Sequence, residues 1–173
     1  MNKINILIIE DLKSESVPLM ELLTKNGFNV VAVAENFKDA IKVFYEEPID
    51  LLIIDVFLNG VPDGITFAET ISTVPGSLKP FIFLTSSKDR KIFDRAKLTS
   101  PFSFLLKPFN ELEVLYAIEM ALEKFYDQGM ALTGETKNAV INDDHVFVKK
   151  NKSLKKISIA DILYVEVEQR YCN

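Results

Sequence analysis

The first 126 residues predict an α/β fold built on a parallel β-sheet. Five short apolar segments alternate with amphipathic segments, in the order strand then helix, which is typical of such a sheet. Several of the apolar segments are nearly continuous, as expected for strands covered by helices on both faces. The predicted strands are Ile4–Ile9, Phe28–Ala34, Leu51–Asp55, Phe81–Thr85 and Phe102–Leu106.

The helices between these strands have recognisable ends. We expect the first to follow Ser16 and to stop at Asn26, so that Pro18 falls in the first turn, where proline is tolerated. The last should begin at Asn110 and Glu113, whose spacing fits a capping box. Its apolar stripe at helical period comprises Leu112, Leu115, Tyr116, Ile118, Met120, Leu122 and Phe125.

The pattern changes after Tyr126. Residues 127–141 show no periodicity and contain two glycines, which predicts a linker. Residues 142–173 contain the β-rich segments HVFVKK, LKKISI and ILYVEVE, which favour an antiparallel β fragment. This fragment is too short for a stable core of its own. The chain therefore divides into a domain at 1–126, a linker and a C-terminal β fragment.

The composition indicates a soluble globular protein in a reducing compartment. About half of the residues are apolar and the net charge is −5. The single cysteine, Cys172, excludes an internal disulfide, and no apolar run approaches the roughly 18 residues of a membrane span. The N-terminal apolar run ends in two acids and does not fit a signal peptide. We expect a cytoplasmic protein with no membrane partner.

Polar residues of complementary chemistry follow four of the predicted strands. Glu10 and Asp11 follow the first, Asp55 ends the third, Thr85 ends the fourth and Lys107 follows the fifth. Ligands of open parallel α/β sheets bind at this edge. Two carboxylates about 4 Å apart repel by roughly 4 kcal/mol at an effective dielectric of 20, so the cluster needs a counter-ion. Oxygen ligands of this kind favour Mg²⁺.

Such a cluster could transfer a phosphoryl group. Asp55 is the natural nucleophile, because it ends the central strand between the acidic pair and Thr85. The metal, Lys107 and Thr85 would neutralise charge on the phosphoryl oxygens. Taken singly, these residues could equally be polar turns and helix caps. Their joint occurrence at four strand ends favours a functional site.

The segments IIED, LLIIDV, FLTS and FLLKPF, in this order, resemble the response-regulator receiver family. The resemblance implies a doubly wound, flavodoxin-like sheet of order 2-1-3-4-5. It also implies that a sensor histidine kinase phosphorylates Asp55, and that Mg²⁺ is bound by Glu10, Asp11, Asp55 and the backbone carbonyl of Phe57. Such a domain is not a turnover enzyme: it accepts the phosphoryl group autocatalytically and loses it slowly.

The resemblance also assigns a switch. In the family, the hydroxyl at the position of Thr85 moves toward the phosphoryl group, and the aromatic at the position of Phe104 turns inward. Phosphorylation would then promote homodimerisation. As a residue of an apolar strand, Phe104 fits the alternative role of an ordinary core residue equally well.

The loop after Asp55 departs from the family pattern. The segment VFLNGVPDG is one residue longer than the common loop, and Phe57 is bulky where a small or polar residue is common. We hypothesise that Phe57 slows hydrolysis of the acyl phosphate by restricting the attacking water.

The C-terminal fragment resembles the start of a LytTR-type DNA-binding domain. The match lies in ADILYVEVEQRY, at Asp161, Ile162, Leu163, Tyr164, Glu166 and Tyr171. The resemblance implies a parent protein that regulates transcription, whose DNA-contacting part lies beyond Asn173. The fragment itself should not bind DNA specifically.

Two other functions compete with this interpretation. One is a receiver that acts only by docking a protein partner, with its β-rich tail as a hairpin. The other is a phosphatase resembling the haloacid dehalogenases, which also use an aspartate nucleophile and Mg²⁺. Those enzymes need a second aspartate two residues after the first, where this chain has Phe57.

Overall fold

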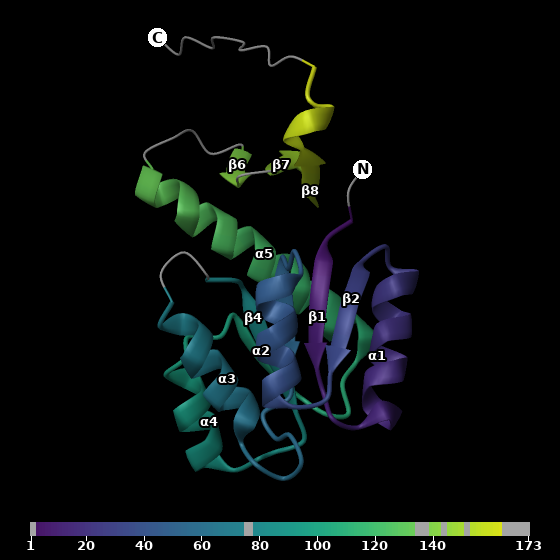
Figure 1. The fold of residues 1–173 in the computed structure, drawn as a ribbon, viewed down its shortest axis with the longest axis vertical. Coiled ribbons are helices and arrows are strands. Elements are labelled where there is room, and N and C mark those ends of the chain that lie inside the picture. Colours follow the sequence, from purple (N-terminus) through teal and green to yellow (C-terminus); the bar gives the residue numbers. More distant parts are fainter. Residues whose placement is uncertain (1–2, 75–77, 134–138, 143–144, 151–152, 164–173) are drawn as a thin grey trace. The chain divides into compact units, whose positions relative to one another are not determined.

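The computed structural model describes residues 3–74, 78–133, 139–142, 145–150 and 153–163. The chain divides into two compact units. The larger unit comprises residues 3–125, and the smaller comprises residues 126–173 together with the first two residues. Figure 1 shows the helices and strands of both.

The larger unit is the predicted doubly wound α/β sheet. Its strands are β1 (Asn5–Ile9), β2 (Asn29–Ala34), β3 (Leu51–Ile54), β4 (Phe81–Thr85) and β5 (Ser103–Leu106). All neighbours pair in parallel, in the order β2-β1-β3-β4-β5, which confirms the expected order. The helices are α1 (Lys13–Lys25), α2 (Phe37–Glu46), α3 (Asp63–Ser72), α4 (Arg90–Lys97) and α5 (Glu111–Thr133).

The sheet is buried on both faces. Successive strand residues point to opposite sides, so β1 sends Leu7 and Ile9 into a cluster that also contains Phe44 of α2 and Phe67 of α3. The intervening residues of β1 are equally buried on the other face. In Figure 1, α2 lies in front of the sheet and α5 passes behind it. This double cover explains the nearly continuous apolar strands.

Helix α1 begins earlier than predicted. The backbone N–H groups of Glu15 and Ser16 both donate to the carbonyl of Leu12, at 3.0 Å, so the helix starts at Lys13 and not after Ser16. Pro18 is consequently the sixth helical residue and lies outside the first turn, contrary to our expectation. The early start places Glu15 in the first turn, beside the strand ends.

The apolar stripe predicted for α5 is partly wrong. Its buried residues are Val114, Ala117, Ile118, Ala121, Leu122 and Tyr126. Three residues assigned to the stripe, Leu112, Tyr116 and Met120, are more than half exposed, at 54%, 58% and 53%. They recur at a spacing of four and occupy the opposite side of the helix, because residues advance by about 100° each.

The smaller unit contains a three-stranded antiparallel sheet. Its strands are β6 (Ala139–Asn142), β7 (His145–Lys150) and β8 (Ser153–Ser158), in the order β6-β7-β8, followed by a 3₁₀ turn at Ile159–Asp161. Strands β7 and β8 match the predicted segments HVFVKK and LKKISI. The third predicted segment, ILYVEVE, falls almost wholly outside the described residues, as do Tyr164, Glu166 and Tyr171.

The segment predicted as a linker, residues 127–141, is partly regular structure. Helix α5 continues through residues 127–133, and β6 begins at Ala139. The glycine at position 129 suggested a break, but one glycine inside a helix costs only about 1 kcal/mol relative to alanine. The alanine, leucine and methionine around it are good helix formers.

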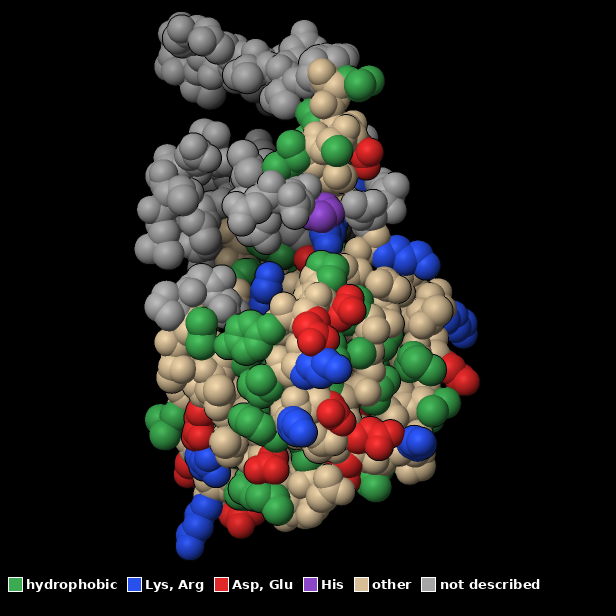
Figure 2. Space-filling view, in the orientation of Figure 1, with side chains coloured by type: hydrophobic (Ala, Val, Ile, Leu, Met, Phe, Trp, Pro, Cys, Tyr) green, Lys and Arg blue, Asp and Glu red, His purple; other side chains and the backbone are tan. Residues whose placement is uncertain are grey.

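Within the described part of the chain, no helix is both long and apolar enough to span a membrane. On the face that Figure 2 shows, acidic, basic and hydrophobic side chains are interspersed over the larger unit. Charges of both signs are therefore mixed on that face.

Candidate active site

The structure brings the predicted residues to one edge of the sheet. Glu10 directly follows β1, Asp55 directly follows β3, Thr85 is the last residue of β4, and Lys107 directly follows β5. Ile9 pairs with Ile54 in register, as Thr85 does with Leu106, so these strands end level with one another. The carboxyl edge of the sheet therefore carries the whole predicted cluster.

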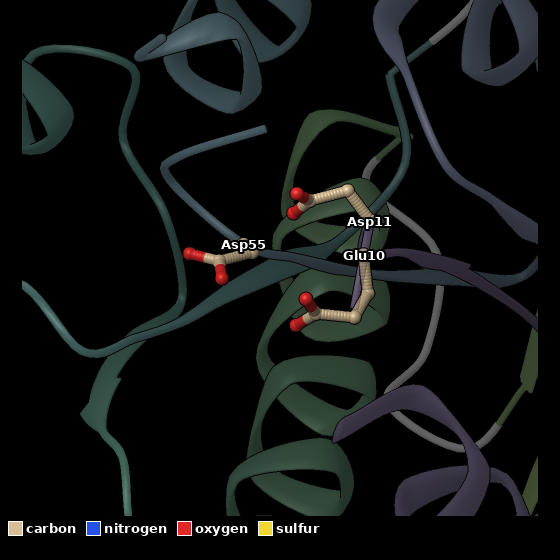
Figure 3. A group of neighbouring side chains, drawn as sticks. All are labelled: Glu10, Asp11 and Asp55. Carbon is tan, nitrogen blue, oxygen red and sulfur yellow. The ribbon is translucent and has the colours of Figure 1, made fainter. Parts of the chain in front are cut away.

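Three carboxylates converge at this edge. Glu10, Asp11 and Asp55 each offer an oxygen, and these oxygens lie within 4.8 Å of one another. In Figure 3 the three side chains project from two neighbouring strand ends, with the Glu10 and Asp11 carboxylates on the side where Asp55 lies. Glu10 and Asp55 are buried, at 4% and 9% exposure, while Asp11 is half-buried. Burial strengthens their mutual repulsion and favours a bound cation.

Each of the three carboxylates is fixed by a backbone N–H. Leu12 donates to Glu10 Oε1 at 3.1 Å, Asn59 to Asp11 Oδ2 at 3.1 Å, and Phe57 to Asp55 Oδ1 at 3.2 Å. The oxygens are thus oriented by the backbone before any ligand binds. An all-oxygen, net-negative donor set of this kind fits a hard divalent cation such as Mg²⁺.

Lys107 supplies the positive charge of the site. Its Nζ donates to Asp55 Oδ2 at 2.7 Å and also to the carboxylates of Glu10 and Glu15. The lysine side chain is 8% exposed. Burial alone would lower its pKa, but the hydrogen bonds to Asp55, Glu10 and Glu15 outweigh burial, and the pKa of Lys107 is raised. The ammonium therefore remains charged at neutral pH.

For the pKa of Glu10, burial outweighs the hydrogen bonds, the reverse of the case of Lys107. Its burial raises the pKa of the carboxyl group above the usual range, while the hydrogen bond from Lys107 opposes that rise. Lys107 thus limits the rise of the Glu10 pKa.

Glu15 was not anticipated from the sequence. It comes from the first turn of α1, and its side chain is 33% exposed where it reaches Lys107. Because α1 starts at Lys13, Glu15 is the third helical residue and lies near the strand ends. With the predicted helix start after Ser16, Glu15 lay outside the helix, and its proximity to Lys107 could not be predicted.

The two predicted switch residues occupy β4 and β5. Thr85 is 1% exposed, and its hydroxyl accepts the N–H of Ser87 at 3.3 Å. Phe104 is half-buried and packs edge-to-face on Phe83 of β4 and Phe93 of α4, with ring centroids 6.0 and 5.1 Å apart. The arrangement links the strand ends to α4 through aromatic contacts.

The longer loop after Asp55 folds into a miniature hairpin. Leu58 and Val61 exchange two backbone hydrogen bonds, of 2.9 and 3.1 Å, around Asn59 and Gly60. Both central residues have positive φ, 53° and 77°, as a two-residue type I′ turn requires. This turn presents the Asn59 N–H to Asp11. The Phe57 side chain, before the hairpin, is half-buried against the core.

The sheet order, the converging carboxylates and the strand-end lysine are together the features of the receiver-type domain that the sequence motifs resemble. Residues 6–119 match the family model described as "Response regulator receiver domain", and the chain belongs to this family. This confirms the receiver assignment of the N-terminal unit; no comparison supports the LytTR assignment of the C-terminal one.

Known proteins agree with this assignment. The chain is 33% identical over 118 residues to a probable chemotaxis protein CheY of Rhizobium etli, covering 68% of this chain and 91% of that protein. It is 31% identical over 130 residues to the transcriptional regulatory protein PdtaR of Mycobacterium tuberculosis, covering 75% of this chain but 62% of PdtaR. An alignment with protein MrkE of Klebsiella pneumoniae, 25% identical, covers 97% of this chain and 61% of MrkE.

A solved structure shares the fold. The signal receiver domain of a modulated diguanylate cyclase from Desulfovibrio desulfuricans superimposes with a TM-score of 0.65 at 32% identity. The match covers 71% of this chain and 96% of that domain. The chain is thus similar to a receiver domain over the length of its larger unit.

Proposed function

We propose that Asp55 accepts a phosphoryl group from a sensor histidine kinase and that this chain is the switch of a two-component response regulator. The observation that carries the proposal is the hydrogen bond of 2.7 Å from Lys107 Nζ to Asp55 Oδ2, made beside the Glu10 and Asp11 carboxylates. It places a charged donor next to the oxygen that would attack phosphorus.

In the proposed step, Asp55 Oδ2 forms a bond to phosphorus as the bond from phosphorus to the kinase histidine nitrogen breaks. The electron pair of that bond remains on the imidazole nitrogen. Lys107 then donates to a phosphoryl oxygen in place of Asp55 Oδ2, and the Thr85 hydroxyl donates to another. Glu10, Asp11, Asp55 and the Phe57 carbonyl would hold Mg²⁺, which supplies further neutralisation of charge on the phosphoryl oxygens.

Treatment with acetyl phosphate and Mg²⁺, followed by intact-mass measurement, tests this function. The wild-type chain should gain one phosphoryl group that is lost in alkali or hydroxylamine, as acyl phosphates are. Asp55→Asn should show no adduct. Asp63→Asn, which removes a carboxylate that is not among the partners of Lys107, should react like the wild type. An adduct that survives in Asp55→Asn would refute the assignment.

We expect Phe57 to influence the rate at which the phosphoryl group is lost from Asp55. Its N–H is held by Asp55 Oδ1 and its ring is half-buried, so it borders the acceptor without a polar group to direct water. Phe57→Asn should speed loss of the phosphoryl group several-fold, because an amide can hydrogen-bond the attacking water. Phe57→Leu, which keeps the apolar bulk, should leave the decay constant near that of the wild type. Equal rate constants for phosphoryl loss in all three proteins would show that Phe57 does not control hydrolysis.

For the output, we propose that phosphorylation promotes a homodimer in the cytoplasm and that the longer parent protein regulates transcription through a LytTR-type domain. The name of PdtaR, a transcriptional regulatory protein, supports a role in transcription, and the MrkE alignment extends across both units. The LytTR type of the output domain rests on the sequence resemblance of Asp161, Ile162 and Leu163 and the residues after them. Sedimentation of this chain with and without phosphodonor tests the first part, since a dimer should appear only with donor. DNA binding by the longer protein tests the second.

A further inference from the structure

The Lys107 ammonium is shared among more carboxylates than phosphoryl transfer requires. An ammonium has three N–H donors, and here they are directed to Asp55, Glu10 and Glu15. In the proposed transfer, a phosphoryl oxygen replaces Asp55 as one of these acceptors. Glu10 belongs to the cation cluster, whereas Glu15 lies outside it. Glu15 is therefore an additional negative charge on the lysine that must receive the phosphoryl group.

Glu15 also lines a hollow next to Lys107. A hollow of about 410 Å³ lies beside the first turn of α1, and Glu15, Ser86, Lys107 and Phe109 are among the residues that line it. Glu15 is a third exposed, while Lys107 is almost fully covered. A small anion in this hollow would therefore lie beside both the Glu15 carboxylate and Lys107.

We propose that Glu15 is a positioning residue that, by sharing Lys107, selects phosphodonors by charge. It orients the ammonium and at the same time weakens its attraction for anions, so a donor with more negative charge is disfavoured more strongly. The proposal rests on Asp55 being the phosphoacceptor. Small donors with more negative charge then react more slowly than less charged donors of similar size, and transfer from a kinase phosphohistidine, whose protein supplies its own complementary contacts, is favoured.

Two small donors of different charge test this selection. Near neutral pH acetyl phosphate is a dianion and phosphoramidate is mainly a monoanion. Glu15→Gln keeps the shape and removes the charge, so the second-order rate constant for acetyl phosphate should rise more than that for phosphoramidate. We expect the ratio of the two constants to increase about three- to tenfold, and the ionic-strength dependence of the acetyl phosphate reaction to change.

Control variants distinguish an effect of the Glu15 charge from a change in the structure of α1. Glu15→Asp keeps the charge and should restore the ratio toward the wild-type value. Glu21→Gln removes an exposed charge from the same helix and should leave the ratio unchanged. Thermal unfolding of each variant verifies that it is folded.

The outcomes distinguish this inference from the proposed function. If wild-type protein forms no Asp55 adduct with either donor, the proposed function fails. If it forms the adduct but Glu15→Gln changes both rate constants by the same factor, or neither, only charge selection by Glu15 is refuted. A selective rise for acetyl phosphate supports it.

Discussion

Replacing Lys107 with methionine is expected to lower the free energy of unfolding by about 3–5 kcal/mol in metal-free buffer. The substitution leaves the buried carboxylates of Glu10 and Asp55 without their cationic partner. Removing one member of a buried ion pair is costly because the remaining charge is neither hydrated nor neutralised. Urea denaturation in the presence of EDTA measures the loss.

The same measurement in millimolar Mg²⁺ should give a smaller loss. A cation bound by the folded state alone stabilises that state and takes over part of the neutralisation that Lys107 provided. Lys97→Met, at an exposed position at the end of α4, should be nearly neutral in both buffers. An equal loss with and without Mg²⁺ would contradict a cation site shared with Lys107.

Gly64→Ala is expected to be the second strongly disruptive change. An added Cβ would lie 1.8 Å from the carbonyl oxygen of Asp55 and 2.9 Å from its carbonyl carbon. Because both are backbone atoms, the start of α3 and the end of β3 must separate. Overpacking typically costs 1–3 kcal/mol, and we expect about 3 kcal/mol or more here. The displacement of Asp55 should also slow formation of the acetyl phosphate adduct by at least tenfold.

A suitable control is Gly27→Ala. Gly27 follows α1 with φ of 87°, and nothing lies within 4 Å of an added Cβ. This variant should lose about 1 kcal/mol from backbone strain alone and should phosphorylate normally. Normal phosphorylation of a folded Gly64→Ala protein would show that Asp55 tolerates the displacement.

The sheet and most of the site could be predicted because they depend on strand ends. Apolar runs of four or five residues mark strands, and in a parallel sheet their carboxyl ends share one edge. Glu10, Asp55 and Lys107 therefore had to converge if the strands were correct. The structure places the three side chains in direct contact through the lysine ammonium.

Glu15 could not be found in this way because the start of α1 carries no local signal. The residue before the helix, Leu12, has no side-chain oxygen to cap it, and Pro18 suggested a later start. Helix α1 is instead held by burial of Leu19, Leu22 and Leu23, which is a tertiary effect. Periodicity likewise could not tell which apolar side of α5 meets the sheet, because both sides carry large hydrophobic residues.

The rings around Phe104 connect β4 and β5 to α4 by apolar contacts alone. Phe81, Phe83, Phe104 and Phe93 make successive edge-to-face contacts, with centroids 5.5, 6.0 and 5.1 Å apart, from β4 through β5 to α4. Phenylalanine has no hydroxyl, so rotation of Phe104 breaks no hydrogen bond of its side chain and changes only the space left to its neighbours. In the proposed switch, phosphorylation of Asp55 would therefore reach α4 as a redistribution of volume, and the response would depend on how tightly Phe93 fills the space beside that ring.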